Sequence, residues 1–137
     1  MAAGHVLVDA GFLVALLGRR DAHHAWAVEQ AARFAPPWST CESALSEAFY
    51  LLGAEGAPVL GALLRRRALR IAFELGDHVD GVLKLMDKYA DVPASLADMC
   101  LVRMTEIVEN PTILTTDADF RVYRRHGRQT IPCVTPT

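Results

Sequence analysis

Apolar residues along the chain fall into short continuous runs that alternate with longer segments in which apolar side chains recur every three or four positions. Short apolar runs predict buried strands, and the longer spacing predicts helices. The predicted strands are His5–Val8, Trp38–Thr40, Leu69–Phe73, Thr112–Thr115 and Thr130–Val134. The predicted helices are Ala10–Leu17, Asp21–Arg33, Glu42–Leu52, Pro58–Arg67, Gly76–Tyr89, Pro93–Val108 and Ala118–Arg125.

This alternation predicts an α/β fold with three layers. Strands that are separated by helices pair in parallel, and the helices then cover both faces of the sheet. We therefore expect a mostly parallel central sheet of four to five strands flanked by helices. In such sheets, functional groups gather beyond the carboxyl ends of the strands.

Length and composition agree with one globular domain over residues 1–137. The chain is 52% hydrophobic and 22% charged, which is enough apolar material for a core and argues against a disordered chain. No continuous apolar run reaches the ~18 residues that a membrane span needs, so we expect no membrane association.

Charge is balanced overall but unevenly distributed. The net charge is −2, which by itself argues mildly against a nucleic-acid partner. Arginines nevertheless form two clusters, and an acidic site between basic clusters would give the same near-neutral sum. The clusters are Arg65, Arg66, Arg67 and Arg70, and Arg121, Arg124, Arg125 and Arg128.

Cysteines are few and widely spaced. Cys41, Cys100 and Cys133 make an odd set that fits neither a disulfide framework nor a zinc motif. We interpret them as buried or half-buried thiols of a protein in the reducing cytoplasm.

Two aspartates follow predicted strands. Asp9 comes directly after the first strand, and Asp117 comes after the strand that ends at Thr115. A single aspartate at such a position more often caps a helix or turn. Two of them at the same edge of a parallel sheet favour a functional site.

Two further acids lie near predicted helix starts. Ser95 and Asp98 match a capping box, but a carboxylate in a first turn can also face a site. Ser39 and Glu42 match a second capping box, which gives Glu42 a structural role. Glu47 has no such role and falls at the edge of an apolar helix face, where a carboxylate needs a cation or an arginine nearby.

The set Asp9, Glu47, Asp98 and Asp117 is therefore the candidate site. Four carboxylates without matching histidines favour a hard cation, Mg²⁺ or Mn²⁺, over zinc. Such ions activate water and neutralise charge at a phosphodiester under attack. We expect His23, His24 and His126 to be surface or capping residues instead.

Four segments together resemble the PIN-domain family, in particular the VapC-type ribonuclease toxins of toxin–antitoxin pairs. They span nearly the whole chain in the family's order. Each is weak alone, whereas the ordered set is fairly specific. The segments are Val6–Gly11, Leu45–Ala48, Tyr89–Asp98 and Ile113–Phe120. After Asp98 the chain departs from the small, alanine-rich residues that such proteins often have.

The resemblance implies a Mg²⁺- or Mn²⁺-dependent endoribonuclease, the toxin of a type II toxin–antitoxin pair, acting in the cytoplasm on RNA. Its partners would be an RNA substrate, a cognate antitoxin protein and a second copy in a homodimer. The acidic quartet falls on Asp9, Glu47, Asp98 and Asp117. Possible outer contacts are Asp119, Asp91 and Thr115, and possible contacts to the RNA backbone are Arg121, Arg124 and Arg125.

Two other functions stay open from the sequence. A PIN fold with an inactive pocket could serve as an RNA- or protein-binding module without a toxin role. A phosphate-transfer protein of the response-regulator type also places acids at strand ends, but it needs a lysine after its last strand. The only lysines here, Lys84 and Lys88, fall in a predicted helix.

Overall fold

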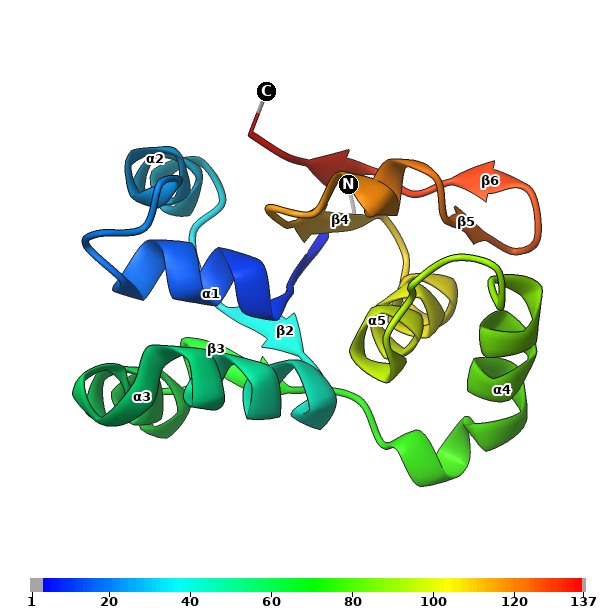
Figure 1. The fold of residues 1–137 in the computed structure, drawn as a ribbon, viewed down its shortest axis with the longest axis horizontal. Coiled ribbons are helices and arrows are strands. Elements are labelled where there is room, and N and C mark those ends of the chain that lie inside the picture. Colours follow the sequence, from blue (N-terminus) through cyan, green and yellow to red (C-terminus); the bar gives the residue numbers. More distant parts are fainter. Residues whose placement is uncertain (1–3, 137) are drawn as a thin grey trace.

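Five short strands form the central sheet in the computed structural model, which describes residues 4–136 (Figure 1). Their order is β3-β2-β1-β4-β7, and every neighbouring pair is parallel, which confirms the predicted sheet. The two ends of the predicted domain, residues 1–3 and 137, lie outside the described residues. The strands are β1 (His5–Val8), β2 (Trp38–Thr40), β3 (Leu69–Ile71), β4 (Pro111–Leu114) and β7 (Cys133–Val134).

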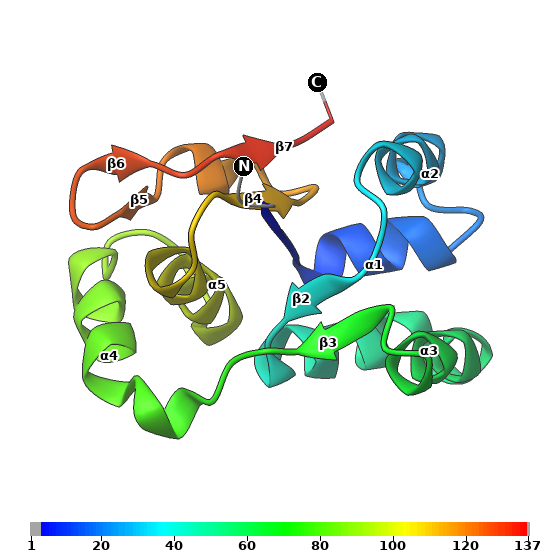
Figure 2. The same cartoon turned by 180° about the vertical axis from the view of Figure 1, so that it is seen from behind.

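Helices cover both faces of this sheet (Figure 2). One face carries α1 (Ala10–Leu17), α2 (His24–Arg33) and most of α3 (Glu42–Arg65), and the other carries α4 (Val79–Lys88) and α5 (Leu96–Ile107). Two 3₁₀ turns, η1 (Leu75–Asp77) and η2 (Ala118–Arg121), complete the helical elements. This arrangement is the predicted three-layer α/β fold.

Alternating side chains of the central strands fill two separate cores. Leu7 and Ile113 point into the cluster beneath α4 and α5, whereas Val8 and Leu114 point into the cluster beneath α1, α2 and α3. Successive side chains of a strand face opposite sides of the sheet, so a strand that is covered on both faces is apolar at every position. Each such side chain contributes about 1.5–3 kcal/mol by leaving water.

A glycine interrupts α3. Gly53 has φ 66° and ψ −162°, a conformation that side chains rarely adopt, and the helix restarts directly after it. The predicted break was therefore correct, but the predicted helix Pro58–Arg67 begins too late and ends two residues beyond Arg65. By length and composition α3 could cross a membrane, yet Gly53 divides it into two segments that are each shorter than a span requires.

Two predicted helices on the other face begin later than expected. The segment Gly76–Tyr89 is divided into η1 and α4, and α5 begins at Leu96 rather than at Pro93. The side chain of Ser95 caps α5, because it accepts a hydrogen bond from the backbone N–H of Asp98 over 3.0 Å. Pro93 lies in the turn before this cap.

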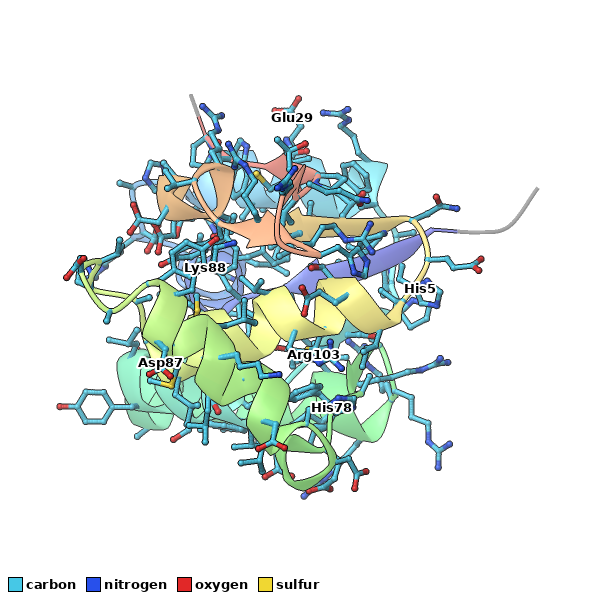
Figure 3. The ribbon with its side chains drawn as sticks, turned by 90° about the vertical axis from the view of Figure 1, so that its right-hand side faces the viewer. His5, Glu29, His78, Asp87, Lys88 and Arg103 are labelled. Carbon is cyan, nitrogen blue, oxygen red and sulfur yellow. The ribbon has the colours of Figure 1, made fainter. Side chains whose placement is uncertain are left out.

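The predicted helix Ala118–Arg125 is wrong in its second half. After η2 the chain forms a hairpin of β5 (Arg124–Arg125) and β6 (Gln129–Thr130), whose turn has positive φ at His126 and Gly127. Lys88 Nζ donates to the carbonyl of Gly127 over 2.8 Å and ties the hairpin to α4 (Figure 3). The predicted strand Thr130–Val134 is consequently divided between β6 and β7.

Smaller differences concern element ends. The third strand ends at Ile71, not at Phe73. Asp21 does not cap α2: its side chain accepts from His23 N–H, and α2 starts at His24.

The predicted capping box of Ser39 and Glu42 does not form either. Cys41 is the N-cap of α3, and no side chain accepts a hydrogen bond there.

Candidate active site

The candidate site lies where the chain reverses direction across the sheet. From β1 the chain continues to β2 and β3 on one side, then crosses over to β4 on the other, so β1 and β4 are neighbours without being consecutive. Such a switch point opens a crevice at the carboxyl ends of its strands. Asp9 directly follows β1, and Asp117 follows β4 by three residues.

Asp9 is the most buried of the candidate acids, with 7% of its surface exposed. Its Oδ1 accepts a 2.8 Å hydrogen bond from the backbone N–H of Phe12, which makes it the N-cap of α1. Its Oδ2 accepts a hydrogen bond from the hydroxyl of Thr115. Asp9 therefore caps a helix and lines the site at once.

Thr115 connects the two strand-end aspartates. Its buried hydroxyl donates to the Asp9 carboxylate and accepts a 2.9 Å hydrogen bond from the backbone N–H of Asp117. Asp117 in turn caps η2, because its Oδ1 accepts from Asp119 N–H over 2.9 Å. These bonds fix the relative position of Asp9 and Asp117.

Asp98 is held at the start of α5 by two donors. The predicted capping box with Ser95 is present, and the Ser95 N–H reaches Asp98 Oδ2 over 3.4 Å. The hydroxyl of Tyr123 donates to the same oxygen over 3.2 Å. Tyr123 is fully buried, and its ring contacts Tyr89 and Phe120 edge-on, so its hydroxyl has little freedom to move.

Glu47, not Glu42, reaches this group. Glu47 lies in the second turn of α3 and lines the same cavity as the three aspartates. Glu42 is exposed at the start of α3 and lines a different, smaller cavity near Phe73. The choice between the two glutamates that the sequence suggested therefore agrees with their positions.

The four carboxylates line one cavity of about 170 Å³. Its remaining walls are small or apolar. The backbone at Gly11 packs closely against Thr116, because a Cβ at position 11 would lie 2.2 Å from Thr116 Oγ1. The other wall residues are Ala10, Ala44, Ala97, Leu101 and Thr116.

No basic side chain lines this cavity, and none of the four acids forms an ion pair within residues 4–136. Burial, and secondarily the charges of Asp98 and Asp117, raise the pKa of Asp9 to about 6 against the hydrogen bonds that lower it. Burial also raises the pKa of Asp98 and of Glu47, and the charge of Asp98 adds to the shift at Glu47. The site therefore concentrates negative charge without a counter-charge from the protein.

The acids are near one another but are not pre-assembled around a metal position. Within the described part of the chain, no three His, Cys, Asp or Glu side chains already form a group that could hold a metal ion. The hydrogen bonds that Asp9, Asp98 and Asp117 make to backbone N–H groups keep one oxygen of each turned toward its helix start.

We expect the metal-free protein to lose stability as the pH rises from about 4 to above 6. Asp9 titrates near 3.8 when unfolded and near 6 when folded, so the unfolded chain ionises first. The stabilisation by protonated Asp9 is complete below about pH 4 and is lost as the pH passes 6. Asp9 then lowers the free energy of unfolding by at most about 3 kcal/mol.

Urea unfolding in EDTA at pH 4.5 and pH 7 measures this loss, and the Asp9→Asn variant should show less of it. An equal pH dependence in both proteins would contradict the assignment of the shift to Asp9.

Comparisons with known proteins identify the family of the fold. The family model for the PIN domain matches residues 6–125, which is most of the chain. The chain belongs to the PIN-domain family. Among solved structures, VapC20 of Mycobacterium tuberculosis, described as a Sarcin-Ricin loop cleaving toxin, is similar with a TM-score of 0.72 and 22% identity. The match covers 85% of this chain and 93% of that one. No curated protein sequence matches the chain.

Two of the three residues that we expected around the acidic quartet lie at the site, and the third does not. Thr115 makes the hydrogen bonds described above, and Asp119 stands next to Asp117, close enough to raise the pKa of Tyr123 by its charge, after the larger effects of burial and of Asp98. Asp91 is exposed in the turn before α5 and does not line the cavity. Sequence reasoning missed Tyr123, because a tyrosine in a segment predicted as helix gave no signal for a contact to Asp98.

The three arginines that we expected to contact RNA form hydrogen bonds within the protein. Arg124 donates to the carbonyls of three residues that precede it or adjoin it, and Arg125 donates to those of Thr105 and Val108 at the end of α5. Arg121 donates to the hydroxyl of Thr135. Contacts of these arginines to an RNA backbone stay a prediction, and Arg121, the most exposed of the three, is best placed for one.

Proposed function

We propose that this PIN domain is a divalent-metal-dependent endoribonuclease and the toxin of a type II toxin–antitoxin pair. The observation that carries the proposal is the cavity with four carboxylates and no basic side chain. Closely spaced carboxylates without a protein counter-charge are suited to a bound cation, and burial raises the pKa of Asp9, Asp98 and Glu47. The similarity to a toxin that cleaves the Sarcin-Ricin loop supports RNA as the substrate class.

The donor set fits Mg²⁺ or Mn²⁺. Asp9, Asp98 and Asp117 would hold the ion, and Glu47, on the exposed side of the cavity, would complete the set or orient water. Oxygen-only ligands are those that hard cations prefer. When bound, the ion supplies an activated water and neutralises charge that develops on the phosphodiester.

The chain's own residues would arrange these ligands. Thr115 keeps the Asp9 carboxylate oriented, and Tyr123 keeps that of Asp98 oriented, so neither acid has to give up freedom when the ion binds. The raised pKa of Tyr123 keeps its hydroxyl protonated, and it remains a donor at neutral pH.

Glutamine substitutions at the two glutamates test this ligand set. We expect Glu47→Gln to weaken Mn²⁺ binding by about tenfold or more, because a charged oxygen ligand is lost. The matched control Glu42→Gln should leave Mn²⁺ affinity unchanged, since Glu42 does not line the cavity. Calorimetric titration of both variants measures this, and equal affinities would remove Glu47 from the site.

The antitoxin partner would bind the outer surface of α1 and α3. A groove of about 470 Å³ runs between the end of α1 and the second half of α3, with Leu52 and Val59 on one side and Arg19 and Arg20 at its rim. Leu51 is 61% exposed nearby, which suits an apolar helix laid in a groove. Leu13 of α1 is completely buried and cannot contribute to this surface.

We expect the antitoxin to direct an arginine or lysine toward the acidic cavity. A basic side chain would pair with the carboxylates and compete with the metal. Expression of the chain alone should then arrest growth, and co-expression of a short partner encoded next to it should restore growth. Harmless expression of the parent chain would remove the toxin role and leave the nuclease proposal standing.

A cytoplasmic location is part of the same proposal, and an RNA substrate together with three free cysteines supports it. A homodimer is our expectation from the family resemblance, and light scattering on the purified chain tests it.

A binding module without catalysis is the second candidate. It would use the same fold but would show no metal-dependent cleavage. The response-regulator alternative is disfavoured, because Lys84 and Lys88 both lie on α4 and neither lines the acidic cavity.

A further inference from the structure

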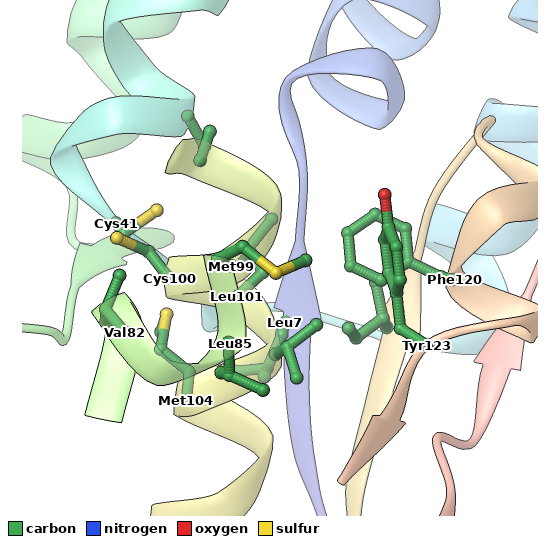
Figure 4. Close-up of a cluster of buried hydrophobic side chains, with 14 of the residues drawn as sticks. Leu7, Cys41, Val82, Leu85, Met99, Cys100, Leu101, Met104, Phe120 and Tyr123 are labelled. Carbon is green, nitrogen blue, oxygen red and sulfur yellow. The ribbon is translucent and has the colours of Figure 1, made fainter. Parts of the chain in front are cut away.

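Two cysteines from separate elements meet beside the acidic cavity. Cys41 is the N-cap residue of α3, and Cys100 lies in the second turn of α5. Both are free thiols and both are buried. Figure 4 shows their sulfur atoms turned toward one another, and both side chains line the same small cavity. They thus form a contacting dithiol pair rather than two isolated core cysteines.

A small cavity gives access to this pair. It has a volume of about 80 Å³, and both cysteines line it together with polar side chains such as Ser43 and Glu74. A peroxide molecule fits such a space, whereas a protein thiol does not. Cys133, the third cysteine, lies on β7 at the sheet edge and does not line this cavity.

We propose that Cys41 and Cys100 are an oxidation site that closes to a reversible intramolecular disulfide when the protein meets hydrogen peroxide. The Cys100 thiolate attacks one peroxide oxygen, so an S–O bond forms, the O–O bond breaks and water leaves after protonation. The Cys41 sulfur then attacks the sulfenic sulfur, the S–S bond forms, and the oxygen leaves as a second water molecule. The two thiols lose two electrons and two protons, and the peroxide takes up both.

The disulfide would act on the acidic cavity through its two helices. Ala44 follows Cys41 by one turn of α3, Leu101 adjoins Cys100 on α5, and both line the acidic cavity. A disulfide draws two sulfurs from contact distance to about 2.05 Å, and we expect one helix to shift toward the other as it forms. Glu47 lies on α3 and Asp98 lies on α5, so both would move relative to Asp9. A loss of nuclease activity on oxidation follows, and this consequence rests on the proposed function.

Thiol counting on the folded protein tests the site without any activity assay. The protein is treated with hydrogen peroxide, quenched, denatured and titrated for free thiols, and cysteine peptides are mapped by mass spectrometry. We expect free thiols to fall from three to one, with a Cys41–Cys100 linked peptide that dithiothreitol removes. A linked peptide that contains Cys133, or a sulfinic acid at Cys100 with Cys41 still free, would overturn the proposal.

Two variants make the test specific. Cys41→Ser places a residue that is favoured at an N-cap, so the fold should be retained while the disulfide becomes impossible. Cys133→Ser removes the uninvolved thiol, and its free thiols should fall from two to none. In Cys41→Ser we expect an oxidised Cys100, as a sulfenic or sulfinic acid, and no linked peptide. If Cys41→Ser loses only the Cys133 thiol and Cys100 stays free, the pair is not the oxidation site.

RNA cleavage measured on the same samples tests whether the disulfide inhibits the nuclease. We expect RNA cleavage to fall at least fivefold as the linked peptide forms, and to return with dithiothreitol. Unchanged cleavage despite a complete link would overturn the regulatory consequence. A parent protein without cleavage in Mn²⁺ would instead count against the proposed function, and the thiol counts would still decide whether the site exists.

Discussion

The Asp9→Asn variant should lose RNA cleavage by about 10²–10³-fold, since a bound metal contributes several kcal/mol to such a reaction and each 1.4 kcal/mol is a factor of ten. Asparagine has nearly the same shape and can still accept the hydrogen bond from Phe12 N–H that caps α1. The loss would therefore come from the missing charge rather than from misfolding. Initial rates on a fluorescent RNA at saturating Mn²⁺ measure it.

Stability provides the control for this substitution. Burial opposes the charge on Asp9, so without metal Asp9→Asn should be at least as stable as the parent at pH 7. A variant that is inactive and also strongly destabilised would indicate a structural role only. A variant that cleaves as fast as the parent would show that Asp9 is not part of the active site.

Manganese should raise the melting temperature of the parent protein by about 10 °C. A ligand at a hundredfold excess over its Kd stabilises the folded state by about 2.7 kcal/mol, and each kcal/mol shifts a domain of this size by a few degrees. The rise should be larger at pH 7 than at pH 5, because protons compete for Asp9, whose pKa is about 6. Differential scanning calorimetry with Mn²⁺ and with EDTA measures both.

Sodium chloride at the same ionic strength is the control for screening among the acids. Screening alone would relieve repulsion between Asp98 and its neighbours and would raise the melting temperature slightly. A rise with Mn²⁺ no larger than that with salt would mean that no metal site exists at neutral pH.

Much of the fold could be predicted because its strands are buried on both faces. Short apolar runs such as Val6–Val8 suit such strands, and helices between them imply parallel pairing. The ends of helices were harder to predict where two local signals compete. Pro93 is acceptable in a first helical turn, but Ser95 caps α5 better because it satisfies a backbone donor.

The hairpin at residues 124–130 could not be predicted from periodicity. Its strands are two residues long, and its turn depends on positive φ at His126 as well as at Gly127. Non-glycine residues seldom adopt that conformation, so the sequence alone favoured a helix. The hairpin forms because Arg125 reaches the carbonyls at the end of α5, a contact that only the assembled fold provides.

The acids could be predicted because strand ends and helix starts meet at one edge of a parallel sheet. Asp9 and Asp117 followed from that rule, whereas Glu47 was separated from Glu42 only by its lack of a capping role. Tyr123 could not be found in this way. Its hydroxyl reaches Asp98 through tertiary packing against Tyr89 and Phe120, and no local pattern encodes that contact.

Cleavage of RNA by the purified chain under metal control tests the proposed chemistry most directly. In one reaction series a synthetic RNA is incubated with the protein in EDTA, then with excess Mn²⁺, then with EDTA restored. We expect no cleavage in the first step, rapid cleavage in the second and arrest in the third, because in our proposal the carboxylates of Asp9, Asp98 and Asp117 act on a phosphodiester through a bound cation. Cleavage at the same rate in all three steps, or none in any step by a folded protein, would contradict a metal-dependent nuclease.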